Sequence, residues 1–146
     1  IHSDRVIHRI NGILYKPCFH HHPCTQWVAK NRRNFLYACE LNLELCQENN
    51  FRYGRRFNGV DATLEAIGHS DVIPDDIYSD LYPVAINADN LKLMFQTGVF
   101  TPKEYISLVK KEWVPFSLAM KAYRSYYKIC KSHLAKWTKR SQPEWY

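Results

Sequence analysis

The feature that most constrains the fold is a helical stripe between residues 35 and 53. Its members are Leu36, Cys39, Leu43, Cys46, Asn50 and Tyr53, with Phe35, Ala38 and Leu45 beside them. Side chains spaced three and four apart share one face of an α-helix. Gly54 follows directly, and glycine is typical of a helix C-cap because it adopts positive φ without a steric penalty. We therefore predict a long amphipathic helix that ends at Gly54.

Four further segments carry helical signals: residues 25–30, 60–67, 102–113 and 117–137. We expect Thr25 to cap the first of these, Asn31 and Asn34 to mark a break after it, and Gly68 to end the second in a left-handed cap. Thr101 and Glu104, with a proline between them, match the capping box.

The fold class follows from these signals. We predict a mostly α protein, a single compact helical domain of about five helices, with a long acidic loop at 69–90. The chain has 146 residues, which suits one domain over 1–146. It opens without methionine, inside a helical pattern at 4–10, so we expect a native N-terminal segment to be missing.

Composition excludes some classes of protein. No apolar run approaches the roughly 20 residues of a membrane span, and no leader precedes a cleavage site. We therefore expect no membrane association. The five cysteines are an odd number at irregular spacing, which favours a reducing compartment over a disulfide framework.

Charge is spread unevenly along the chain. Residues 1–60 sum to +5, residues 61–100 to −6 and residues 101–146 to +7. Two basic ends around an acidic middle predict one basic face that contacts a polyanion such as DNA, with the acidic loop folded away from it. The alternative is that these charges only solvate helix faces.

Cations and aromatic rings alternate near the C-terminus. Such a surface can bind phosphates with its charges and stack rings on unpaired bases. The candidates here are Arg124, Tyr126, Lys128 and Arg140. The alternative is a core-facing stripe formed by Tyr123, Tyr127, Cys130, Leu134 and Trp137.

A second basic cluster lies at the end of the long helix. Arg52, Arg55 and Arg56 surround Gly54 and could give bidentate contacts to phosphate. Cations also complement the negative end of a helix dipole, so a purely stabilising role is the alternative.

Histidines and cysteines gather between Cys18 and Cys24. The spacing is weak evidence for zinc because no second paired unit accompanies it, and we predict neither a metal nor a cofactor. A further hypothesis places the imidazole of His22 and the thiol of Cys24 beside an anion-attracting helix N-terminus.

Glu40, Glu44 and Glu48 recur every four residues along the long helix. Carboxylates at this spacing usually form a solvated face, but one of them could serve as a catalytic acid or base.

Three stretches together resemble a known family. They are residues 22–28 (HPCTQWV), residues 52–55 (RYGR), and residues 122–127 (AYRSYY) followed by Trp137, Arg140 and residues 143–145 (PEW). The chain resembles small bacteriophage proteins sometimes labelled pyrimidine-dimer DNA glycosylase-like. The match covers most of the chain outside residues 58–115.

This resemblance implies a phage-encoded DNA-binding protein in the host cytoplasm, a glycosylase that excises a damaged or modified pyrimidine after base extrusion. In the enzymes of that family an N-terminal α-amine attacks the sugar carbon and displaces the base, which leads to a Schiff base between the protein and the sugar. The resemblance implies that Glu44 or Glu40 would assist this attack and that His22 would belong to the same site. The alternatives are a non-catalytic nucleic-acid-binding module, and a structural or anti-defence protein that binds an acidic partner.

Overall fold

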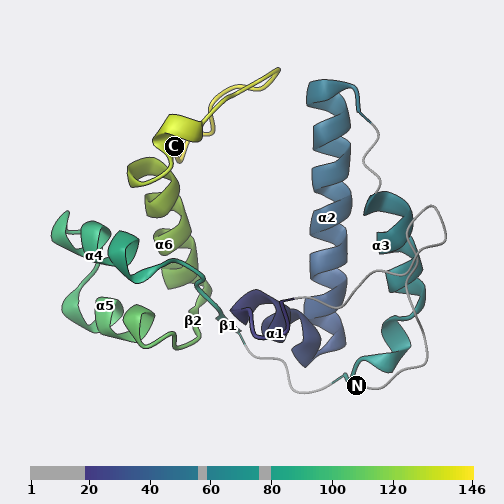
Figure 1. Cartoon of the computed structure of the whole chain (residues 1–146), viewed down its shortest axis with the longest axis horizontal. Helices are drawn as coiled ribbons and strands as arrows, with labels where there is room; N and C mark the ends of the chain where they lie inside the picture. The colour runs from purple at the N-terminus through teal and green to yellow at the C-terminus, as the bar shows by residue number, and fades with distance from the viewer. Residues whose placement is uncertain (1–18, 56–58, 76–79) are drawn as a thin grey trace. The chain divides into compact units, whose positions relative to one another are not determined.

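The computed structural model describes residues 19–55, 59–75 and 80–146, which form six α-helices and one two-stranded sheet (Figure 1). The prediction of a mostly α protein is confirmed. The chain divides into two compact units, residues 1–78 and residues 79–146. The prediction of a single domain stays a prediction. None of the described helices is long and apolar enough to cross a membrane.

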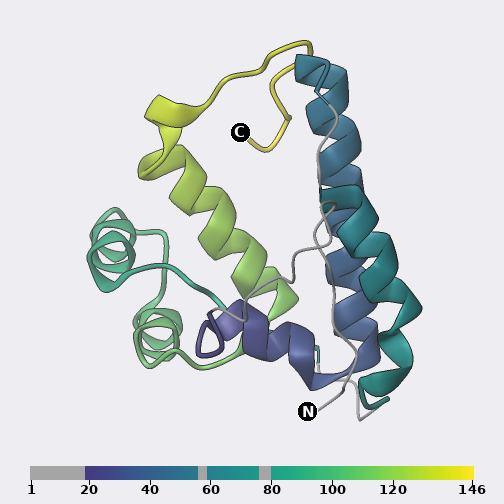
Figure 2. The ribbon, with the colours of Figure 1, turned by 45° about the vertical axis from the view of Figure 1, so that its right-hand side comes forward.

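The first unit is built around the long helix α2 (Arg32–Tyr53), which contacts α1 (Pro23–Lys30), α3 (Gly59–Gly68) and the short 3₁₀ turn η1 (Ser70–Val72). Figure 2 shows α3 lying along α2. The predicted end of α2 is confirmed: Gly54 has φ of 65° and donates its N–H to the Asn50 carbonyl oxygen over 2.7 Å.

Asn31 separates α1 from α2, as the sequence indicated. It is the C-cap of α1 and the N-cap of α2, where its Oδ1 accepts the Asn34 N–H over 2.8 Å. The cap predicted for α1 is wrong. The helix begins two residues before Thr25, because Pro23 occupies the first turn and His22 accepts the Cys24 N–H.

The acidic segment after α3 is partly ordered by α2. Arg32 donates from Nε to the Ser70 carbonyl oxygen over 3.0 Å, and from its backbone N–H to the Pro74 carbonyl oxygen over 2.9 Å. The left-handed cap predicted at Gly68 is wrong, since positive φ among the described glycines is confined to Gly54 and Gly98. Gly68 is the last residue of α3 instead.

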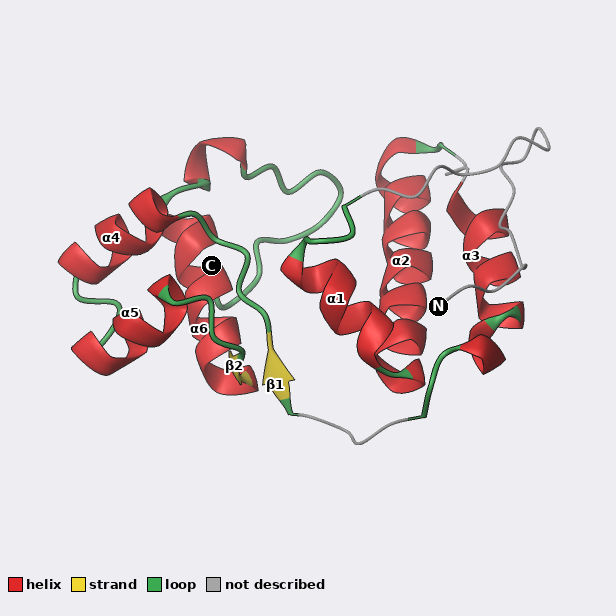
Figure 3. Ribbon diagram, turned by 60° about the horizontal axis from the view of Figure 1, so that its bottom comes forward, coloured by secondary structure: helices red, strands yellow, loops and turns green. Residues whose placement is uncertain are grey.

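The second unit combines a small sheet with three helices. Strand β1 (Leu81–Tyr82) pairs antiparallel with β2 (Val114–Pro115). Helices α4 (Ala88–Gln96) and α5 (Pro102–Val109) connect the two strands, and α6 (Phe116–Ile129) follows β2 (Figure 3). Strand β1 and the start of α4 lie within residues 69–90, which were predicted to form a long acidic loop. Two-residue strands carry too little pattern to be recognised before their partner is known.

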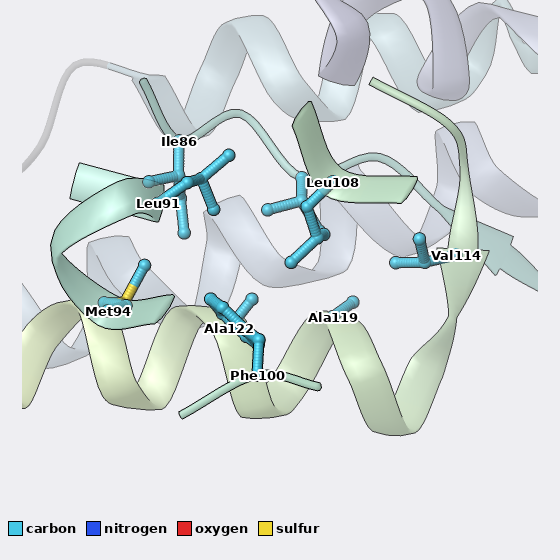
Figure 4. Packing of buried hydrophobic residues seen from close by; sticks show 9 residues of the cluster. Ile86, Leu91, Met94, Phe100, Leu108, Val114, Ala119 and Ala122 are labelled. Atoms are coloured by element: carbon cyan, nitrogen blue, oxygen red, sulfur yellow. The ribbon is translucent and has the colours of Figure 1, made fainter. Parts of the chain in front are cut away.

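The core of this unit lies between α4, α5 and α6. Its buried side chains are Val84, Ile86, Leu91, Met94, Phe100, Leu108, Val114, Ala119 and Ala122 (Figure 4). The small residues Ala119 and Ala122 let α6 approach closely, and Tyr123 on the same helix accepts the Ala85 N–H at its hydroxyl over 2.9 Å.

In the second unit, α5 and α6 both end earlier than predicted. Helix α5 begins with the predicted capping box but ends at Val109, after which Lys111 has φ of 58°. Helix α6 ends at Ile129 rather than near Trp137, and the 3₁₀ turn η2 (Ser132–Leu134) follows. The apolar spacing continued through this turn, so the sequence did not reveal where the helix stops.

Candidate nucleic-acid interface

The positive charge of this protein belongs to one of its two units. Residues 79–146 carry eleven Lys and Arg against five Asp and Glu, whereas residues 1–78 carry nine of each. The net charge of +6 therefore comes from the second unit as a whole. Between residues 113 and 143 there are seven basic residues and no acidic one.

Helix α6 presents the first members of this run on one face. Lys121, Arg124 and Lys128 follow one another at three-residue and four-residue intervals, which places them on the same side of the helix. Lys121 is paired with Glu104 over 2.9 Å, and Arg124 and Lys128 are exposed residues. Arg140, in the segment after η2, is also exposed.

A cavity of about 440 Å³ lies at the C-terminal end of α6, within the second unit. Its lining residues are Tyr126, Tyr127, Lys131, Leu134, Ala135, Trp137, Trp145 and Tyr146. Five of these eight residues are aromatic. We call this cavity the aromatic pocket. Its volume falls within the roughly 300–1,000 Å³ of small-molecule sites.

The rings of the aromatic pocket contact one another in edge-to-face geometry. Tyr126 and Tyr127 have centroids 5.8 Å apart at 62°, Trp137 and Tyr146 are 5.0 Å apart at 74°, and Trp145 and Tyr146 are 5.7 Å apart at 64°. The Tyr146 hydroxyl is buried without a hydrogen-bond partner in the described structure. A polar group in that position is costly unless something satisfies it.

Two cations lie against rings of this pocket. The Lys131 ammonium is 5.6 Å from the centroid of the Tyr126 ring, and the Arg124 guanidinium is 5.5 Å from that of Trp145. Cation–π attraction holds both positive charges at the aromatic pocket.

Some of the residues predicted near the C-terminus pack against the core, and others line the aromatic pocket. Tyr126 packs partly against the core and also lines the aromatic pocket. The alternative of a continuous core stripe holds for Tyr123 and Cys130 but is wrong for Tyr127 and Leu134, which are 51% and 61% exposed. Leu134 lies in the 3₁₀ turn beyond the end of α6, where the helical spacing no longer applies.

Lys131 belongs to the alternation of cations and rings that the sequence shows near the C-terminus, but Trp145 and Tyr146 were not expected at a site. The signal available for these two was an adjacent aromatic pair after a proline, and such a pair in an irregular segment has no periodicity to interpret. Only the turn after α6 brings these residues to Tyr126 and Tyr127.

The predicted basic cluster of Arg52, Arg55 and Arg56 lies in the first unit, apart from the aromatic pocket. Arg52 donates from Nε to Glu48 Oε1 over 2.6 Å, one helical turn away, which favours the stabilising role. Arg55 is exposed beyond Gly54, and Arg56 lies outside the described residues. These arginines and the basic run of α6 belong to separate units, so the predicted joint basic face stays a prediction.

The predicted catalytic residues also lie in the first unit. Glu40 and Glu44 are exposed on α2, as a solvated face requires, and exposed His22 uses Nδ1 to accept the Cys24 N–H over 3.2 Å. These three residues do not line the aromatic pocket.

A second cavity, of about 400 Å³, lies among α1, α2 and α3 and has a mostly apolar lining that includes Cys39, Asn42 and Thr63. Burial, and then the negative charge of Glu40, raise the pKa of the Cys39 thiol. Cys39 and Cys46 are buried, as expected of core cysteines.

Within the described ranges, no three His, Cys, Asp or Glu side chains gather as metal ligands would. Cys18 lies outside those ranges, so the zinc alternative is not tested.

The chain was compared with protein families, curated proteins and solved structures. No family model matches the chain, and no curated protein or solved structure is significantly similar to it. The resemblance to the phage glycosylase-like family stays a prediction.

Proposed function

We propose that this chain is a phage-encoded DNA-binding protein whose DNA-binding surface lies in residues 79–146. The observation that carries the proposal is the confinement of the net positive charge to this unit, with seven basic residues and no acidic one between residues 113 and 143. Lysine and arginine side chains that neutralise phosphates release counterions from DNA, which supplies most of the affinity of such proteins.

Charge reversal tests this proposal. The double variant Arg124→Glu/Arg140→Glu is compared with Lys92→Glu/Lys103→Glu, which makes the same change in net charge on α4 and α5 of the same unit. Binding of a fluorescent duplex is measured across a range of salt concentrations, with circular dichroism as a check of folding.

We expect the first double variant to bind at least about ten-fold more weakly. The slope of log K against log salt should also flatten by about two, because each phosphate contact contributes about 0.9 on duplex DNA. The control should keep most of the affinity. Equal losses in both variants would show that net charge alone matters, and would remove Arg124 and Arg140 from the surface.

A base-excision glycosylase is the more specific form of this proposal. Enzymes that act on a base extrude it from the duplex first. The resemblance supplies Glu44, Glu40 and His22 as candidate catalytic residues, and these three belong to the first unit and do not line the aromatic pocket of the second.

Catalysis is tested by incubating the protein with irradiated duplex in the presence of borohydride, which traps a Schiff base as a stable adduct. A trapped adduct that Glu44→Gln or Glu40→Gln abolishes, and that Glu112→Gln leaves intact, supports the glycosylase. Absence of both adduct and abasic product leaves the non-catalytic binding module.

A further inference from the structure

The aromatic pocket is distinguished by the cavity that its rings line, which has a volume of about 440 Å³. Its rings meet edge to face at 62° to 74°. Elsewhere in the same unit, Tyr82 and Phe116 meet in the same way at 62°, and Phe95 and Tyr105 stack at 7°. The feature that calls for a ligand is therefore the group of rings around an open cavity, with two cations against them.

We propose that the aromatic pocket binds one unpaired nucleobase of a DNA strand, an inference that rests on the proposed DNA-binding function. The base stacks on the aromatic rings that line the cavity while the phosphates beside it contact Lys131 and the basic residues of α6. Every base has a π-face, so stacking of this kind is largely independent of sequence.

The charges at the pocket favour a nucleobase over other ligands that aromatic rings attract. A quaternary ammonium group also binds among rings, but Lys131 and Arg124 already place positive charge against Tyr126 and Trp145. These charges repel a cation and attract the phosphates attached to a base. An acidic peptide would also satisfy the charges, and poly-glutamate represents this alternative in the test.

The test compares four fluorescent or competing ligands: a single-stranded 12-mer, its duplex, a backbone of the same length made of abasic residues, and poly-glutamate. The proteins are the full chain and its variants Tyr127→Leu, Trp145→Leu and Tyr53→Leu. Tyr53, at the end of α2, is the matched control because it is 53% exposed, against 51% for Tyr127. Tyr126 is left intact because it packs against the core.

We expect Tyr127→Leu and Trp145→Leu to weaken single-strand binding by about 5-fold to 100-fold, the range that corresponds to loss of one stacked base. Binding of the duplex and of the abasic backbone should change less than about two-fold, as should every measurement on the control.

Three failures are distinguishable. If the wild-type chain binds duplex and abasic backbone with strong salt dependence but the ring variants match Tyr53→Leu, the pocket inference is overturned and the DNA-binding function stands. If the wild-type chain binds none of the nucleic acids, the proposed function itself fails. Binding of poly-glutamate that the ring variants weaken equally would overturn the inference in favour of an acidic protein partner.

A measurement on the unaltered chain covers the case in which a variant does not fold. Ultraviolet cross-linking of the single strand, followed by mass spectrometry, should give adducts on peptides that contain residues 126–127 or 145–146. Adducts confined to other peptides contradict the proposal.

Discussion

The Asn34 side chain donates a hydrogen bond from Nδ2 to the backbone carbonyl oxygen of Trp27 over 2.8 Å. Both residues are buried, and the bond ties the end of α1 to the first turn of α2. The bend between these helices therefore depends on one amide group in the interior of the first unit.

Replacing Asn34 with alanine should destabilise the chain by about 0.5–1.5 kcal/mol, because a hydrogen bond between two buried residues is lost. Urea denaturation measures the loss. Asn50→Ala, at an exposed position of the same helix, is the control and should be neutral or slightly stabilising. Equal effects of the two substitutions would show that the hydrogen bond contributes nothing.

The two glycines that follow or end helices of the first unit should respond in opposite ways to alanine. Gly54 has φ of 65°, so Gly54→Ala should cost about 1 kcal/mol. Gly68 does not have positive φ, and a Cβ there would meet no atom within 4 Å. We expect Gly68→Ala to stabilise by about 0.5–1 kcal/mol. Thermal unfolding of both variants checks the contrast, which would be lost if Gly68 formed the cap.

The stability of the second unit should depend on pH through Glu104. Hydrogen bonding to the Thr101 backbone N–H, and then to the Lys121 ammonium, lowers the pKa of this carboxyl. A lowered pKa in the folded state gives stabilisation that is present above the unfolded value, about 4.3, and is lost as the pH falls through the folded value.

Glu104→Gln isolates this effect, because glutamine keeps an oxygen for the cap but loses the charge. We expect the variant to be less stable at pH 7 by up to about 1 kcal/mol, since solvent screens the pair. The difference should begin to shrink as the pH falls below about 4.3 and should vanish once the pH is below the lowered pKa of the folded state. Denaturation curves from about pH 7 downward measure it.

Cys39 should resist alkylation in the folded chain. Its thiol is buried and its pKa is raised, so little thiolate forms at mildly alkaline pH, and the thiolate is the reactive species. Peptide mapping after iodoacetamide treatment should show Cys39 modified much more slowly in the native chain than in urea. Equal rates would mean that the cavity beside α2 admits the reagent freely.

Local patterns in the sequence predicted most of the helices. The spacing from Leu36 to Tyr53 and the glycine after it defined α2 and its end, and Thr101 with Glu104 defined the start of α5. These signals are sufficient because a helix cap and a helix face involve residues within a few positions of one another.

The candidate site was predicted only in part. Arg124 and Tyr126 were expected at a ligand surface, and both contribute to the aromatic pocket or its charges. The partners that make it a pocket, Lys131, Trp145 and Tyr146, lie in a turn and an irregular segment where no period exists to interpret.

By itself the sequence determined the helical class, the break at Asn31, the end of α2 at Gly54, the start of α5 and the basic character of residues 113–143. Only the tertiary structure decided that Leu81 pairs with Pro115, that the helical path ends at Ile129, and that five aromatic rings meet around one cavity. The physical reason is the range of the interactions. Hydrogen bonds within a helix are local, whereas strand pairing and ring contacts join residues far apart in the chain and form only when packing brings them together.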